Sequence, residues 1–138
     1  MRIMAFDYGT KRTGIAVTDP LQIIATSLTT IHTKDSLEFI KKYLQTEAVE
    51  RFVVGKPLRL DGSDSSSAPH VKGFIRSLKK NFPHIDVVTV DERFTSKLAS
   101  ASIIQSGFKK SKRQEKGLVD SVSAVIILQT YLDSPHLH

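Results

Sequence analysis

The feature that most constrains the fold is the opening run of the chain. An apolar segment, residues 3–6, ends in the carboxylate of Asp7, and a second apolar segment, residues 15–17, follows after a short turn. Two such segments joined so closely predict a β-hairpin, in which Gly9 can supply a positive φ at no steric cost. An acid at the end of a buried strand is an unusual choice for stability alone, so Asp7 is the first candidate functional residue.

The hydrophobic period then changes along the chain, from that of strands to that of helices. Asp35, with Glu38 three residues later, predicts a capping box at the start of the first helix. The last helix is apolar almost all round, which predicts that it is buried against a sheet. Strands are predicted at residues 2–7, 13–18, 21–30, 51–55 and 85–90, and helices at 36–46, from Pro69 to Asn81, from Thr95 or Ser96 to Gly107, and at 117–132.

This order of elements is typical of one class of fold. Three antiparallel strands followed by strand–helix crossovers predict an α/β fold, with a mixed five-stranded sheet covered by helices on both faces. No internal repeat or linker interrupts the pattern, and 138 residues suit one domain. We therefore expect residues 1–138 to form a single domain.

Composition excludes several functional classes. The chain has no cysteine, so it has no disulfide, no cysteine-based zinc site and no thiol nucleophile. No apolar run reaches the roughly 18 residues that span a bilayer, so we expect a cytoplasmic protein without a membrane partner. The net charge of +6 favours nucleic acid as the partner. Basic residues gather in one short segment, which could bind phosphates or could be a solvated loop: Lys109, Lys110, Lys112, Arg113 and Lys116.

Acidic residues stand where strands end and where the last helix begins. Asp7 ends the first strand, Asp91 and Glu92 end the fifth, and Asp120 lies in the first turn of the last helix. Sites in open α/β sheets gather at the carboxyl ends of strands, so these carboxylates converge if the first and fifth strands end on one edge. Because side chains alternate along a regular strand, Asp91 and Glu92 cannot both point into one site, and spacing alone does not choose between them.

Each acid also has a structural interpretation. Asp7 could accept backbone N–H bonds in its turn, one of Asp91 and Glu92 could cap the next helix, and Asp120 could interact with the helix dipole. Converging carboxylates in a nucleic-acid-binding fold favour Mg²⁺ or Mn²⁺, which prefer carboxylate and water oxygens. Two such ions roughly 4 Å apart can promote in-line hydrolysis of a phosphodiester.

Four motifs together resemble a known family. They are DYGTKRTGIAVTD at 7–19, GKPLRLDG at 55–62, DERFTS at 91–96 and KGLVDSVSAVIILQTYL at 116–132. In this order, through nearly the whole chain, they resemble the YqgF family, which is related to the RuvC-type Holliday-junction resolvases within the RNase H-like fold. The departures are small: Lys56 stands where an apolar residue is common, and Ser121 and Ser123 replace alanine-like positions.

The resemblance implies a function and a site. It implies a nuclease that matures the 5′ end of pre-16S ribosomal RNA, although older naming in the family proposes junction resolution. It also implies that Asp7, Glu92 and Asp120 form the metal site, with Glu92 preferred to Asp91. On that reading, structured or single-stranded RNA is the partner, ribosomal particles are a further one, and the chain is a monomer or weak homodimer.

The basic residues then have hypothetical roles. Lys11 and Arg12 would hold the phosphate backbone beside Asp7, and Arg93 would do the same or pair with an acid. The cluster at 109–116 would supply salt-dependent affinity. Three other functions stay open. They are a junction-specific DNase, which should act as a two-fold dimer, a non-catalytic RNA-binding protein of ribosome maturation and, last, a nucleotide-binding module, for which the Walker A pattern is absent.

Overall fold

A computed structural model of the chain describes residues 1–56, 68–91 and 116–133, and the side chains of all of these except 91 and 116–121. Within these ranges five strands form one mixed sheet in the order β3-β2-β1-β4-β5. The strands are β1 (Arg2–Tyr8), β2 (Arg12–Thr18), β3 (Ala25–His32), β4 (Val49–Lys56) and β5 (Asp86–Asp91). The helices are the 3₁₀ turn η1 (Thr33–Asp35), α1 (Ser36–Thr46), α2 (Ala68–Asn81) and α5 (Lys116–Asp133).

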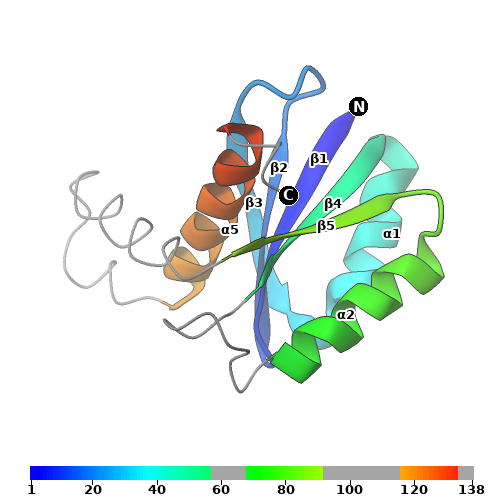
Figure 1. Ribbon diagram of the computed structural model, residues 1–138, viewed down its shortest axis with the longest axis vertical. Coiled ribbons are helices and arrows are strands. Elements are labelled where there is room, and N and C mark those ends of the chain that lie inside the picture. Colours follow the sequence, from blue (N-terminus) through cyan, green and yellow to red (C-terminus); the bar gives the residue numbers. More distant parts are fainter. Residues whose placement is uncertain (57–67, 92–115, 134–138) are drawn as a thin grey trace.

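The sheet combines the two kinds of pairing that the sequence predicts. β1, β2 and β3 form an antiparallel meander, whereas β1, β4 and β5 are parallel. α1 and α2 cover one face and α5 covers the other (Figure 1). The predicted α/β fold with a mixed five-stranded sheet is therefore confirmed. The helix predicted from Thr95 or Ser96 to Gly107 lies outside the described residues.

The third strand begins later than predicted. It runs from Ala25 to His32, not from residue 21 to 30. The reason is the carboxylate of Asp19, which accepts the backbone N–H groups of Ile23 at 2.7 Å and Ile24 at 2.8 Å and so folds the segment into a loop. Gln22 in the same loop has a φ of 60°, which an extended strand excludes.

The first helix covers the predicted residues, but its predicted cap is wrong. α1 spans Ser36–Thr46, yet Asp35 is already in the right-handed helical region and its side chain makes no capping hydrogen bond. The hydroxyl of Ser36 instead donates to the carbonyl oxygen of Thr33 at 2.7 Å. The turn of 3₁₀ helix that precedes α1 explains the difference, because it leaves no extended residue in the N-cap position.

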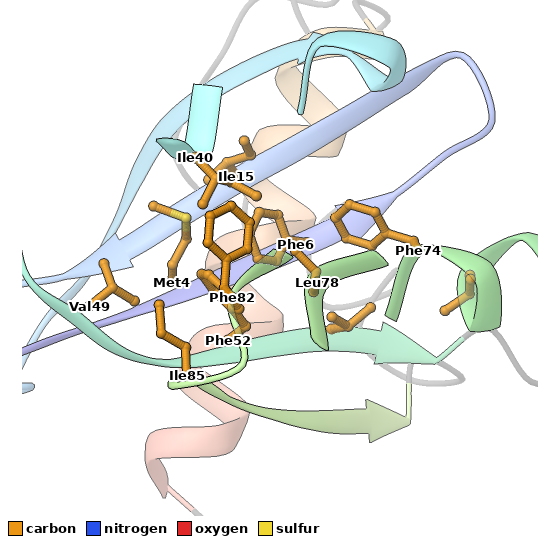
Figure 2. Packing of buried hydrophobic residues seen from close by; sticks show 12 residues of the cluster. Met4, Phe6, Ile15, Ile40, Val49, Phe52, Phe74, Leu78, Phe82 and Ile85 are labelled. Carbon is orange, nitrogen blue, oxygen red and sulfur yellow. The ribbon is translucent and has the colours of Figure 1, made fainter. Parts of the chain in front are cut away.

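The face under α1 and α2 has an aromatic core. The rings of Phe6 and Phe52 meet edge to face with centroids 5.5 Å apart, and Phe6 meets Phe74 of α2 in the same way at 5.4 Å. Phe82 packs on Phe52 just after α2, and Leu78 lies beside them (Figure 2). Burying each such side chain contributes about 1.5–3 kcal/mol, so this face supplies much of the stability.

The face under α5 is built from smaller side chains. Ala5 of β1 and Ala16 of β2 are fully buried there against Ala124, Ile127 and further residues of α5. The prediction that this helix is buried against a sheet is confirmed, and its outer apolar side chains are half-buried. None of the helices in the described ranges is long and apolar enough to cross a bilayer.

Candidate active site

Asp7 lies one residue before the end of β1 and is half-buried. Ile3 and Ala5 of this strand pack in the core under α5, whereas Met4 and Phe6 pack in the core under α1 and α2. Because side chains alternate along a strand, Asp7 projects on the α5 side of the sheet. The pairing of Asp7 with Gly14 of β2 is regular, so no bulge disturbs this alternation on that side.

The parallel strands end together at one edge of the sheet, which we call the carboxyl edge. Phe6 pairs with Val54 of β4, and Gly55 and Lys56 of β4 pair with Val90 and Asp91 of β5. Neighbouring strands are about 4.8 Å apart, so the ends of β1 and β5 are separated by about 10 Å. The backbone therefore has the geometry that convergence of the acids requires, although the side chain of Asp91 is not described.

Helix α5 brings its amino-terminal end toward the same edge. Near its other end, the hydroxyl of Tyr131 accepts a hydrogen bond from Nη1 of Arg51, close to the start of β4. A rise of about 1.5 Å per residue puts residue 120 about 16 Å from Tyr131 along the helix. A rise of about 3.3 Å per residue puts Gly55 about 13 Å from Arg51 along the strand. The first turns of α5 thus lie near the carboxyl ends of β1 and β4 (Figure 1).

The turn after Asp7 is held by residues that the sequence pattern did not single out. Gly9 is required because a Cβ atom there would lie 2.4 Å from the carbonyl oxygen of Arg12, and not because of a positive φ as predicted. Thr33, at the start of η1, donates its hydroxyl to the carbonyl oxygen of Gly9. Its hydroxyl also lies 2.8 Å from that of Thr13, and its N–H donates to the carbonyl oxygen of Lys11 at 3.0 Å.

These contacts fix the turn that carries two predicted phosphate-binding residues. Lys11 is exposed at its tip and Arg12 is half-buried. The contacts of Thr13 and Thr33 join segments about twenty residues apart, so hydrophobic period and turn composition gave no signal for them. The binding roles of Lys11 and Arg12 stay predictions.

Several predicted site residues cannot be placed. Asp120 and Lys116 lie within α5 and Asp91 ends β5, but their side chains are not described. Among the side chains that are described, no three acids or histidines are close enough together to hold a metal ion. The remaining predicted residues lie outside the described ranges: Glu92, Arg93, Lys109, Lys110, Lys112 and Arg113.

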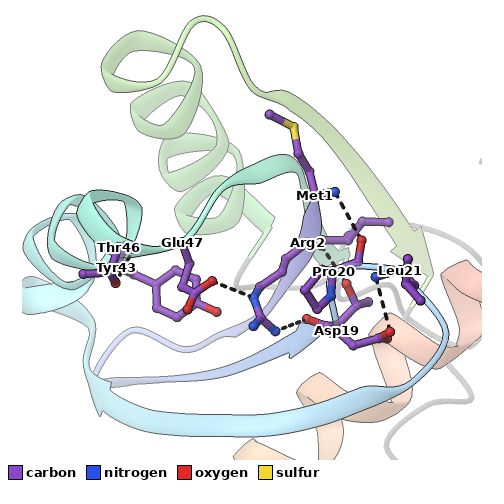
Figure 3. Close-up of polar contacts among 10 residues, drawn as sticks. Met1, Arg2, Asp19, Pro20, Leu21, Tyr43, Thr46 and Glu47 are labelled. Atoms are coloured by element: carbon purple, nitrogen blue, oxygen red, sulfur yellow. Dashed lines mark hydrogen bonds and ion pairs between the residues drawn. The ribbon is translucent and has the colours of Figure 1, made fainter.

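The opposite, amino edge of the sheet uses its charges for structure. Arg2 donates from Nε to Oε2 of Glu47 at 3.2 Å and from Nη1 to the carbonyl oxygen of Thr18 at 2.8 Å (Figure 3). Hydrogen bonds from backbone N–H groups, above all that of Ile24, lower the pKa of Asp19 below its ordinary value. This carboxylate therefore organises a loop by accepting backbone N–H bonds.

Comparison with known proteins identifies relatives along almost the full length. A family model described as "RuvX: Holliday junction resolvase" matches residues 1–134. A protein of Christiangramia forsetii is 52% identical over 131 residues, which cover 95% of this chain and 97% of the relative. One of Bacteroides thetaiotaomicron is 53% identical over 133 residues, 96% of each. Both relatives are named "Putative pre-16S rRNA nuclease".

Solved structures match the fold. The structure described as "T. thermophilus RuvC in complex with Holliday junction substrate" has a TM-score of 0.56 and 17% identity, over 96% of this chain and 95% of that one. Another structure of Thermus thermophilus RuvC has a TM-score of 0.54 and 13% identity, over 98% and 97% of the two chains. At these identities the likeness concerns the fold alone, and it agrees with the RNase H-like architecture that the motifs imply.

Proposed function

This chain belongs to the RuvX family, which is the YqgF family of the sequence motifs, and on that premise we propose that it is a metal-dependent endonuclease. Its proposed substrate is precursor 16S ribosomal RNA, from which it would remove the 5′ extension in the cytoplasm. The names of relatives that are more than half identical over nearly the whole chain support this substrate. The observation that carries the catalytic part is the projection of Asp7 at the carboxyl edge, on the face that α5 covers.

The donor set suits a hard divalent cation. Asp7, Glu92 and Asp120 would hold Mg²⁺ or Mn²⁺, since carboxylate oxygens are the ligands that these ions prefer. Val88 and Val90 of β5 pack on the α5 side. This parity favours Glu92 over Asp91 for the site, because alternate residues of a strand share a face. Asp120 precedes the buried Ala124, Ile127 and Tyr131 at helical spacing, and this spacing supports its part in the proposed site.

When bound, divalent cations activate water and stabilise the leaving oxygen of a phosphodiester. The residues of the chain would bind and orient the substrate. The carboxylates would hold the cations between the end of β1 and the start of α5, where the scissile phosphate would bind. Lys11 and Arg12, in the turn that Thr33 holds, would hold a neighbouring phosphate. Such positioning accounts for a large part of the rate enhancement in reactions of this kind.

The proposal is tested by cleavage of a precursor RNA that carries the 5′ extension, with Mg²⁺, with Mn²⁺ and with chelator. Asp7→Asn should fold normally and lose cleavage by more than about 100-fold, because several kcal/mol of transition-state stabilisation disappear. Asp35→Asn is a matched control, since Asp35 is exposed and makes no capping bond. Cleavage by Asp7→Asn at the rate of the control would contradict the catalytic role.

The family description favours one second candidate, resolution of a four-way DNA junction. A junction assay run beside the RNA assay separates the two substrates. A resolvase must cut two strands symmetrically, so it should also sediment as a two-fold dimer. Preferred cleavage of the junction by such a dimer would replace the RNA proposal. Binding of RNA without Mn²⁺ binding or cleavage of either substrate would indicate a non-catalytic role.

A further inference from the structure

The outer face of α2 carries a row of basic side chains that the proposed site does not use. At 100° per residue, four of them fall within an arc of about 100° on the helix. This arc is opposite the buried face formed by Val71, Phe74 and Leu78. We call this row the α2 stripe, and its members are all exposed: Lys72, Arg76, Lys79 and Lys80.

Beyond Lys72, the stripe meets no compensating negative charge among the residues that the structure describes. No acidic residue occurs anywhere in α2. Within the part of the chain that the structure describes, no carboxylate forms an ion pair with Arg76, Lys79 or Lys80. An acid three or four positions away on a helix can form an ion pair with an exposed basic residue, and α2 has no such acid. From Arg76 to Lys80 the stripe is therefore a positive surface without acidic side chains on the helix.

Helix α1, on the same face of the sheet, gives the contrast. It also has an adjacent lysine pair, Lys41 and Lys42, and both residues are exposed. Glu38 stands three and four positions before them on the helix and is exposed as well, and Asp35 precedes it. The two helices thus present similar lysine pairs in opposite electrostatic settings.

The α2 stripe begins at the carboxyl edge. A depression there is lined by Lys56, the last residue of β4, together with Lys72 of α2 and Thr89 of β5. Lys56 thus adds a further positive charge at the edge where the proposed cleavage site lies. From Lys72 to Lys80 the stripe then extends about 12 Å along the helix, at about 1.5 Å per residue. The stripe, together with Lys56, therefore leads from the carboxyl edge onto the α1–α2 face.

We propose that the α2 stripe binds the phosphate backbone of the RNA strand that flanks the cleavage site. The inference rests on the proposed nuclease function, which places an RNA strand at the carboxyl edge. Backbone contacts of this kind carry no sequence information, but they fix the register of the strand and release counterions on binding. The stripe would therefore increase affinity for RNA that is long enough to leave the edge and cross α2, and it would leave the chemical step unchanged.

The test measures binding of single-stranded RNA in chelator, where no cleavage occurs. Two RNAs are compared, of about 5 and about 16 nucleotides, the range of typical single-strand site sizes. Lys79→Gln/Lys80→Gln should weaken binding of the long RNA and lower the slope of log affinity against log salt by about 1.4, the value for two phosphate contacts. Raising salt from 50 to 200 mM should therefore weaken the wild type about sevenfold more than this variant. Binding of the short RNA should weaken less, because it has fewer phosphates to place along both the edge and the stripe.

Lys41→Gln/Lys42→Gln is the matched control, because it removes the same charge from an adjacent exposed pair on the same face of the sheet. It should change neither the slope nor the preference for the long RNA. Equal effects of the two variants would overturn the proposal and would indicate only a general effect of net charge. Unchanged binding by the Lys79/Lys80 variant would overturn it as well.

The outcome can be separated from that of the nuclease proposal. If the wild type cleaves no RNA yet the Lys79/Lys80 variant loses the salt-dependent affinity, the catalytic proposal is wrong and RNA binding by the stripe is supported. If the wild type cleaves and the variant has the same KM as the wild type on the long RNA, the proposal that the stripe binds RNA is wrong and the nuclease proposal is supported. With both correct, the variant has a raised KM and an unchanged kcat.

Discussion

The two faces of the central sheet are filled by side chains of different size. Under α1 and α2, the strands present Phe6 and Phe52 to an aromatic core. Under α5, the same strands and β2 present Ala5 and Ala16, which meet Ala124 of the helix. Because the distance between packed elements depends on the side chains at the contact, α5 can approach the sheet more closely than the other two helices.

The two faces therefore have different main roles: one stabilises the fold and the other fixes the position of α5. Large rings bury the most apolar surface and make the face under α1 and α2 the main source of stability. Small side chains bury less surface, but they fix the position of α5 relative to β1, and the proposed metal site needs that position to be accurate. The α5 face should therefore be the more sensitive of the two in function and the less sensitive in stability.

Removing a ring from the aromatic face should have the largest effect on stability. Phe52 is fully buried and contacts both Phe6 and Phe82. Phe52→Ala should lower the free energy of unfolding by about 3–5 kcal/mol, the usual cost of this change in a core. Urea denaturation monitored by circular dichroism measures it. Cleavage per folded molecule should stay close to wild type. A loss of activity in the folded fraction would contradict the proposal that the aromatic face serves stability and the α5 face serves positioning of the site.

Enlarging a side chain on the face under α5 should lower cleavage more than it lowers stability. Ala5→Leu should cost about 1–3 kcal/mol through overpacking, and it should also displace α5 from β1. Cleavage should then fall well below that of Phe52→Ala, the core substitution on the aromatic face. The two variants are compared at a temperature where both are fully folded. Equal activities would show that the spacing under α5 does not matter for catalysis.

The contact that ties α5 to β4 should have a smaller effect. Tyr131 accepts a hydrogen bond from Arg51, whose guanidinium also lies 5.8 Å from the centroid of the tyrosine ring. Tyr131→Phe keeps the ring and removes the hydroxyl, so it should cost about 0.5–1.5 kcal/mol. Thermal denaturation measures this loss. A second variant, Tyr131→Ala, should cost more because the ring is also lost, and equal losses would assign no role to the ring.

The smallest effect is expected at the amino edge, away from both cores. The pKa of Asp19 is lowered from its ordinary value of 3.8, first by the hydrogen bond from Ile24. Such a carboxylate contributes stability above its unfolded pKa, and the contribution is lost as pH falls through its lower folded pKa. Asp19→Asn should therefore be less stable than wild type near neutral pH, and the difference should shrink in acid. A difference that grew in acid would contradict this.

The local sequence pattern predicted the layers of the fold well. Apolar periods located the helix at Ser36–Thr46 and the buried stripe of α2, because each depends on neighbours within a few residues. The errors arose where a side chain overrode the local preference. Asp19 holds two β-branched residues, Ile23 and Ile24, in an exposed loop by accepting hydrogen bonds from their backbone N–H groups. The hydrophobic period of the sequence carries no information about such hydrogen bonds.

The site was less predictable than the fold. Asp7 could be singled out because a charged residue stood at the end of an apolar run. Thr33, which holds the turn after it, could not, since the contacting segments are far apart in sequence. The choice of Glu92 over Asp91 needed the family resemblance, and the parity of Val88 and Val90 now supports it independently as a proposal.

The central claim is that Asp7 and Asp120 belong to one metal site between β1 and α5. Titration calorimetry with Mn²⁺ tests it most directly, on the wild type, Asp7→Asn, Asp120→Asn and the control Asp35→Asn. The account predicts that each of the first two substitutions weakens Mn²⁺ binding by at least about 10-fold, since even residues beyond the direct ligands have effects of that size. The control should bind like the wild type. Wild-type Mn²⁺ affinity in Asp7→Asn or in Asp120→Asn would contradict the shared site.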